Sequence, residues 1–176
     1  VQLTEEKNID VISGGPPCQA YSLAGRIRDE NGMKDDYRNF LFVFFLRVVK
    51  YFKPKIIVFE NVEGILSAIP TGEKIVDLIH TAFDESGYEI VNDLRKYALL
   101  DLTEFGIPQK RKRVIIVGIR RDSNSVDYQS ILKKFYTSTL STEKVTEKVT
   151  VKEAIGDLPP IYPLDMPIKR QAYENN

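Results

Sequence analysis

Cys18 is the side chain of this sequence best suited to act as a nucleophile. It is the only cysteine among 176 residues, and it stands in residues 14–22, which read Gly-Gly-Pro-Pro-Cys-Gln-Ala-Tyr-Ser. A lone cysteine usually packs as a small apolar group in a protein core. Here a glycine pair and two rigid prolines shape the backbone just before the thiol, which is an unfavourable setting for mere packing. The segment therefore indicates a loop that presents a reactive cysteine.

Glu60 is the first candidate for an acidic partner. It directly follows the apolar run 56–59, and an apolar setting disfavours the charged form of a carboxylate, which helps it to hold a proton. The alternative is a carboxylate at a strand end or helix start that only accepts hydrogen bonds from backbone amides.

Residues 109–113 read Gln-Lys-Arg-Lys-Arg and supply the candidate cations. Alternate residues of a strand share a face, so Arg111 and Arg113 could serve one site while the two lysines face away. The alternative for this run is a solvated surface cluster.

Composition restricts the class of protein. Hydrophobic residues make up 43% of the chain, and 25 basic residues balance 25 acidic ones, so the net charge gives no sign of a nucleic-acid partner. The longest apolar run, residues 40–46, is too short to cross a membrane. We expect a soluble, intracellular protein without a secretory leader. The only histidine, His80, lies on the polar side of an amphipathic pattern, and no metal-ligand spacing is present, so no metal is predicted.

The elements that must position these residues follow from hydrophobic periodicity. Apolar runs predict buried strands, and longer patterns predict helices. We expect strands at 9–12, 56–59, 88–97 and 114–119, and helices at 37–52 and 73–86, with Gly87 as a left-handed cap. This alternation predicts an α/β fold with an open, mainly parallel sheet and helices on both faces. Ligands of such sheets gather beyond the carboxyl ends of the strands, where Cys18 and Glu60 both fall.

The chain divides into three parts by composition. Residues 1–121 hold the alternating pattern and are expected to form the core. Residues 122–149 are rich in Ser, Thr, Lys and Glu and are expected to form a surface insertion with a short helix around 131–136. Residues 150–176 start as a short helix and continue as an extended tail shaped by prolines. We interpret this part as a connection to a further domain.

The motif around Cys18 closely resembles the Pro-Cys-Gln motif of the DNA cytosine-5 methyltransferases. Further segments resemble this family in the same order and spacing: 36–42, Asp-Tyr-Arg-Asn-Phe-Leu-Phe; 60–62, Glu-Asn-Val; 106–113, Gly-Ile-Pro-Gln-Lys-Arg-Lys-Arg; and 150–159, before the family's target-recognition domain. The resemblance covers residues 9–160. It implies part of a Rossmann-like, S-adenosylmethionine-dependent methyltransferase sheet with one antiparallel strand near 114–119.

The resemblance also implies a covalent mechanism. Cys18 would attack carbon 6 of a cytosine flipped out of the duplex, while Glu60 protonates ring nitrogen 3. Carbon 5 then takes the methyl group, and loss of its proton expels Cys18. Arg113 would reach the ring oxygen and favour the nearby thiolate. Further implied substrate contacts are Pro16, Gln19, Ser22, Asn61, Gln109 and Arg111, with partial cofactor contacts by Pro17 and Leu41.

The sequence lacks the glycine-rich loop and following acidic residue with which the family binds S-adenosylmethionine. We therefore interpret it as a piece of a larger bacterial enzyme that binds double-stranded DNA. We expect the isolated chain to be inactive and, with unpaired sheet edges, prone to self-association. An RNA cytosine methyltransferase of the same superfamily and a catalytically inactive DNA-binding module remain as alternatives.

Overall fold

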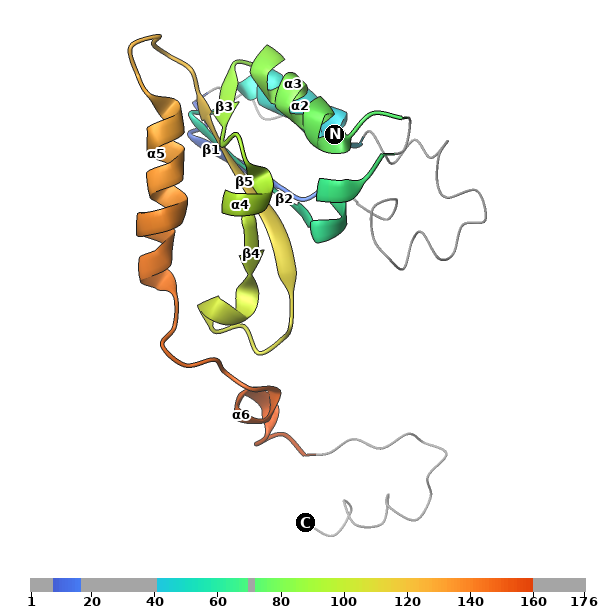
Figure 1. Cartoon of the computed structure of the whole chain (residues 1–176), viewed down its shortest axis with the longest axis vertical. Helices are drawn as coiled ribbons and strands as arrows, with labels where there is room; N and C mark the ends of the chain where they lie inside the picture. Colours follow the sequence, from blue (N-terminus) through green and yellow to red (C-terminus); the bar gives the residue numbers. More distant parts are fainter. Residues whose placement is uncertain (1–7, 17–40, 70–71, 160–176) are drawn as a thin grey trace.

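A five-stranded mixed sheet organises the chain (Figure 1). The computed structural model describes residues 8–16, 41–69 and 72–159. The strand order is β1 (Val11–Gly14), β2 (Ile56–Val62), β5 (Lys112–Arg120), β3 (Tyr88–Ile90), and β4 (Leu99–Asp101) also pairs with β5. β1 is parallel to β2, whereas β5 is antiparallel to its three neighbours. The predicted antiparallel strand near residues 114–119 is thus confirmed.

Two amphipathic helices cover one side of this sheet, and a third helix lies on the other (Figure 1). The first two are α2 (Leu41–Phe52) and α3 (Ile75–Glu85), and the third is α5 (Tyr128–Lys134). α3 ends at Gly87, whose φ of 82° is the left-handed conformation that the sequence predicts there. None of the helices formed by the described residues is long and apolar enough to span a membrane.

The prediction of one strand over residues 88–97 is wrong in its second half. β3 ends at Ile90, and Asp93 then accepts a hydrogen bond from the Lys96 amide at 2.9 Å. This bond caps the short helix α4 (Leu94–Tyr97). A side chain that satisfies an amide at a helix start favours a helical turn over continued strand.

Large apolar side chains from the strands and from both long helices form one core. The ring of Phe59 in β2 meets Phe45 of α2 and Phe83 of α3 in edge-to-face contacts, at centroid distances of 5.5 and 6.1 Å. Gly14 lets β1 approach this core, since a Cβ there would lie 2.7 Å from the Phe45 ring. The core therefore locks the carboxyl ends of β1 and β2 together.

Residues 122–149 are not only a surface insertion, because Leu132 and Tyr136 are buried in the same core. β3 pairs with residues 118–120 of β5 and β4 pairs with residues 112–114, so neither strand pairs with residues 115–117. The Tyr136 hydroxyl binds the backbone of β5 in this interval. This hydroxyl donates to the Ile115 carbonyl and accepts from the Val117 amide, both at 2.8 Å. Burial raises the pKa of Tyr136 to about 12. A tyrosine from the expected insertion thus completes the sheet.

Short helical turns complete the described chain. They are η2 (Glu63–Ser67), η3 (Leu102–Phe105), η4 (Phe135–Thr139), η5 (Leu140–Glu143) and α6 (Val151–Ile155). α6 confirms the helix expected from residue 150, and Thr150 and Glu153 form its capping box. It stands apart from the sheet at the end of an extended segment (Figure 1).

Candidate active site

Glu60 and Arg113 lie on one face of the sheet, near the edge where β2 ends and β5 begins. β2 continues to Val62, so Glu60 lies inside the strand and not at its exit as expected. Glu60 is opposite Ile115, and Val62 is opposite Arg113. Paired residues of antiparallel strands share a face, which makes Glu60 and Arg113 diagonal neighbours.

The two side chains form an ion pair in which Arg113 Nε lies 2.8 Å from Glu60 Oε1. Arg113 Nη1 also donates to the Lys112 carbonyl at 2.8 Å. The arginine side chain is 18% exposed and the carboxylate is 43% exposed. Glu60 therefore does not have the apolar surroundings that the sequence suggested: a guanidinium lies on one side of it and solvent on another. It remains accessible to a ligand.

The segment that leads to Cys18 passes directly beside this pair. A Cβ on Gly15 would lie 2.8 Å from Glu60 Oε2, so a larger residue there would displace the carboxylate from its present position. The next carbonyl, that of Pro16, accepts a hydrogen bond from Asn61 Nδ2 at 3.4 Å. The two close contacts hold the last described residues before Cys18 against β2.

Several predicted site residues lie outside the described part of the chain. These are Cys18, Pro17, Gln19 and Ser22. Leu41 opens α2, but its side chain, on which the cofactor prediction depends, is not described either. Their predicted roles stay predictions.

Asn61 was expected to contact substrate; that role stays a prediction, and the structure gives the residue a different set of contacts. The side chain is 2% exposed and lies on the core-facing side of β2, whereas Glu60 lies on the other face. Successive residues of a strand point to opposite faces, so the neighbour of Glu60 in sequence is turned away from the Glu60–Arg113 pair. Its contact with Pro16 is with protein backbone instead.

Gln109 and Arg111 are both exposed, in the turn before β5. β5 begins only at Lys112, so Arg111 does not share a strand face with Arg113 as expected. The Gln109 amide donates to the Ile107 carbonyl at 2.8 Å, and the Arg111 carbonyl accepts from Leu102 at 2.9 Å. Only the arginine inside the strand reaches Glu60 among the described contacts.

His80, expected at the surface, is half-buried on α3, and burial lowers its pKa. Within residues 8–16, 41–69 and 72–159, no group of three or more His, Cys, Asp or Glu side chains is arranged to hold a metal ion.

The sequence did not reveal that Gly15 and Asn61 shape this site. Gly15 had a signal, because a glycine just before a motif often permits a close approach of the backbone. The alternation of Ile57, Phe59 and Asn61 on one face of the strand was the available signal for Asn61.

Comparisons with known proteins identify the family of this chain. A family model described as C-5 cytosine-specific DNA methylase matches residues 2–176. The type II methyltransferase M.Bpa9945I of Bacillus paralicheniformis is 39% identical over 93% of this chain and 35% of its own length. The type II methyltransferase M.DdeI of Desulfomicrobium norvegicum is 38% identical over 88% of this chain and 33% of its own length.

A crystal structure described as a prophage-encoded DNA modification methyltransferase of E. coli has a similar fold. The TM-score is 0.54 and the identity 29%, over 87% of this chain and 36% of that one. The chain thus spans about a third of the length of these relatives, with 35% and 33% for the two curated proteins. The α/β fold with a mixed sheet is the methyltransferase fold, and the chain belongs to the C-5 cytosine-specific DNA methylase family.

Proposed function

We propose that the protein carrying this chain transfers a methyl group from S-adenosylmethionine to carbon 5 of cytosine in double-stranded DNA. One observation carries the proposal: the Glu60–Arg113 ion pair lies beside the backbone that leads to the only cysteine. A nucleophile, a carboxyl group and a guanidinium together match what cytosine requires, because its carbon 5 becomes nucleophilic only after a group has added to carbon 6 and the ring has temporarily lost its aromaticity.

In the proposed reaction, the Cys18 thiolate forms a bond to carbon 6, and the ring electrons move toward carbon 5 and nitrogen 3. Glu60 donates a proton to nitrogen 3, so negative charge does not build up on the base. After carbon 5 has gained the methyl group, a base removes its proton. The bond to sulfur then breaks, nitrogen 3 returns its proton to Glu60, and 5-methylcytosine leaves with its aromatic ring restored.

Arg113 is suited to two tasks in this scheme. Its Nε holds Glu60 Oε1 and its Nη1 holds the Lys112 carbonyl, so the plane of the guanidinium is fixed. Nη2 would donate to the carbonyl oxygen on carbon 2 of the base, and the positive charge would stabilise the thiolate of Cys18. The pairing keeps the carboxyl group oriented before the substrate arrives.

S-adenosylmethionine is the methyl donor of this family. When bound, it supplies an electrophilic methyl group. The described residues near the carboxyl ends of β1 and β2 provide a carboxylate, a guanidinium and close-packed glycines, but no set of donors that selects adenosine. Contacts from Pro17 and Leu41 to the cofactor therefore stay predictions, and we derive no step through it.

The relatives suggest the biological setting. Both curated relatives described above are named type II methyltransferases and come from bacteria. We infer a bacterial modification enzyme that acts in the cytoplasm on duplex DNA, in which the target cytosine has to leave the stack to reach Glu60 and Arg113.

Duplex DNA with 5-fluorocytosine at the target position tests this function. The complete natural polypeptide that carries this chain is incubated with that DNA and S-adenosylmethionine. Fluorine blocks the final proton loss, so we expect a covalent protein–DNA complex that survives denaturation and is absent in Cys18→Ala. An RNA duplex of the same sequence serves as the control substrate. The absence of an adduct with DNA, or an adduct with RNA alone, would overturn the proposal.

A further inference from the structure

Asn61 occupies a position in β2 where an apolar side chain would be expected. It is 2% exposed and is the one buried polar residue among those that the structure describes. It follows Ile57 and Phe59 on the core-facing side of the strand. A buried carboxamide is unfavourable unless its oxygen and its nitrogen both find partners, so its presence calls for a specific reason.

Both ends of this carboxamide are bonded to backbone. Oδ1 accepts from the Val62 amide at 2.9 Å, and Nδ2 donates to the Pro16 carbonyl at 3.4 Å. Within the described residues, no buried side-chain nitrogen or oxygen lacks a partner. Asn61 therefore links its own strand to the segment that follows β1, across 45 positions of sequence.

The register of the sheet explains why a side chain is needed at this point. The parallel pairing of β1 and β2 ends with Gly14 opposite Phe59. Continuing that register places Gly15 beside Glu60 and Pro16 beside Asn61. Proline has no N–H and cannot extend the ladder. The Asn61 side chain supplies the hydrogen bond that holds Pro16 after the backbone pairing has stopped.

Glu60 and Asn61 hold this segment from opposite faces of the strand. Successive residues point in opposite directions, and both reach toward the segment: Glu60 Oε2 lies against Gly15, and Asn61 Nδ2 bonds Pro16. Two consecutive residues of β2 thus place the acidic group beside Gly15 and bond the chain at Pro16, two residues before Cys18.

We propose that Asn61 is a positioning residue, which sets where the Cys18 segment leaves β2 relative to the Glu60 carboxyl group. The inference rests on the proposed function, in which Cys18 and Glu60 act on the same cytosine. If the Pro16 carbonyl is released, the backbone that precedes the nucleophile shifts. A displacement of about 1 Å between reacting groups can lower a rate by roughly 100-fold, so the reaction rate should be more sensitive than DNA binding.

Asn61→Asp in the complete natural polypeptide tests this. The new carboxylate keeps the acceptor for the Val62 amide but loses the donor to Pro16. At saturating 5-fluorocytosine DNA and S-adenosylmethionine, we expect the rate of covalent adduct formation to fall by about 10- to 100-fold. The DNA concentration that gives half-maximal rate should change by less than about twofold, because Asn61 does not face the proposed base site.

A pH series separates positioning from general damage. Burial favours the protonated form of the introduced carboxyl group, and that form can again donate to Pro16. The ratio of the variant rate to the wild-type rate should therefore rise as pH is lowered from about 8 to about 6. A flat ratio would contradict the assigned hydrogen bond.

Gln129→Glu is the matched control. Gln129 Nε2 also donates to a backbone carbonyl, that of Ile90, at 2.7 Å, but at the far end of the sheet from Glu60. We expect this variant to lower stability and leave the adduct rate of the folded enzyme unchanged. If Asn61→Asp does not fold, Asn61→Ser, which is too short to reach Pro16, should show the same rate loss.

The outcomes distinguish the two proposals. Failure of the wild-type protein to form any adduct would defeat the proposed function. A wild-type adduct together with an undiminished rate in folded Asn61→Asp and Asn61→Ser would defeat the role of Asn61 alone. An equal rate loss in Gln129→Glu would also defeat it.

Discussion

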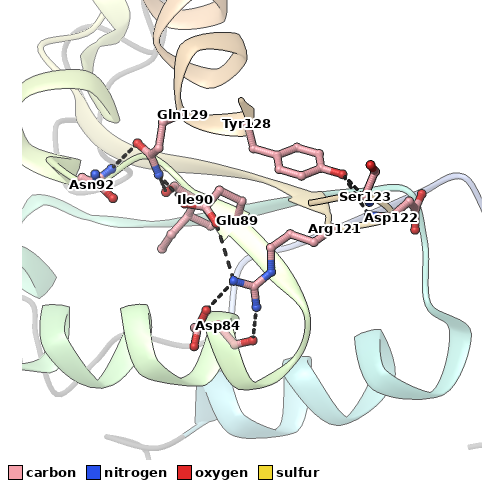
Figure 2. A network of polar contacts seen from close by, with 9 residues as sticks. All are labelled: Asp84, Glu89, Ile90, Asn92, Arg121, Asp122, Ser123, Tyr128 and Gln129. Carbon is pink, nitrogen blue, oxygen red and sulfur yellow. Dashed lines mark hydrogen bonds and ion pairs between the residues drawn. The ribbon is translucent and has the colours of Figure 1, made fainter. Parts of the chain in front are cut away.

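The two ends of β5 each carry an arginine paired with carboxylates, and the two clusters are built differently. At the start of the strand, Arg113 makes one ion pair, with Glu60, and one bond to a neighbouring carbonyl. Just past its end, Arg121 binds Asp84 through Oδ1 at 2.5 Å and through the backbone carbonyl at 2.6 Å, and lies 3.6 Å from Glu89 (Figure 2).

The second cluster extends further through Gln129 (Figure 2). Its Nε2 donates to Glu89 at 2.5 Å and to the Ile90 carbonyl at 2.7 Å, while its Oε1 accepts from the Asn92 amide at 3.2 Å. These bonds tie α3, β3, β5 and α5 together. The cluster around Arg121 and Gln129 thus binds protein groups from several elements, whereas Glu60 has one ion-pair partner among the described residues, Arg113.

The difference shows how to separate a structural ion pair from one prepared for chemistry. Both contain an arginine and a carboxylate at hydrogen-bond distance, so neither composition nor distance distinguishes them. What distinguishes them is the number of protein groups that each cluster binds, and the number of separate elements that those groups come from. By that criterion, stability should depend on the cluster around Arg121 and activity on the one around Arg113.

Glu60→Gln should have the largest effect on function. The amide keeps the size of the side chain but cannot transfer the proton, and general acid catalysis contributes about 10²- to 10⁴-fold. We expect the single-turnover methylation rate of the complete polypeptide to fall within that range. The free energy of unfolding should change by less than about 1 kcal/mol, because the pair is partly exposed.

Glu89→Gln makes the same chemical change in the other cluster and serves as the control. It should leave the methylation rate of the folded protein unaltered. Equal rate losses in the two variants would show that the two clusters do not differ in the way we infer.

Tyr136→Phe should have the largest effect on stability, because the hydroxyl bonds β5 midway between the two clusters. Its loss leaves a partly buried carbonyl and a partly buried amide without this partner, which we expect to lower the free energy of unfolding by about 1 to 2 kcal/mol. Urea unfolding at neutral pH measures this. Unchanged stability would mean that residues 115–117 of β5 do not need the hydroxyl.

The stability difference between wild type and Tyr136→Phe should also depend on pH. The pKa of Tyr136 is raised from 10.0 to about 12 by burial, so folding favours the neutral phenol. Its contribution is complete below pH 10 and is lost as pH rises from there toward about 12, by at most about 1.4 kcal/mol per pH unit. The gap in stability between wild type and Tyr136→Phe should therefore narrow over that window.

Arg121→Met should have the smallest effect of the three. It removes the bonds to Asp84 while keeping an apolar stem, and the exposure of Asp84 limits the loss to about 1 kcal/mol. Arg113→Met, measured in parallel by urea unfolding, should cost less stability. A larger loss for Arg113→Met would reverse the assignment of the structural cluster.

Local signals in the sequence were sufficient for the long elements. The apolar runs 56–59 and 114–119 became β2 and β5, the periodic run 73–86 became α3, and Gly87 adopted its left-handed conformation. These succeed because hydrophobic period and a glycine cap act within one element, independently of its neighbours.

The short strands and helices, and the contacts between distant segments, could not be predicted from such local patterns. β4 has three residues and exists because Leu99–Asp101 find β5 as a partner. The expected strand over 88–97 gave way to a helix cap at Asp93. Tyr136 is buried because neither β3 nor β4 pairs with residues 115–117 of β5. The local sequence around Tyr136 contains no sign of that arrangement.

The sequence by itself determined that this chain presents Cys18, Glu60 and Arg113 in the order and spacing of a cytosine-5 methylase. Their roles in the proposed reaction stay predictions. Tertiary structure alone decided that Glu60 pairs with Arg113 and that Asn61 turns away to hold Pro16. Those facts depend on strand register, and register arises from the packing of segments that are far apart along the chain.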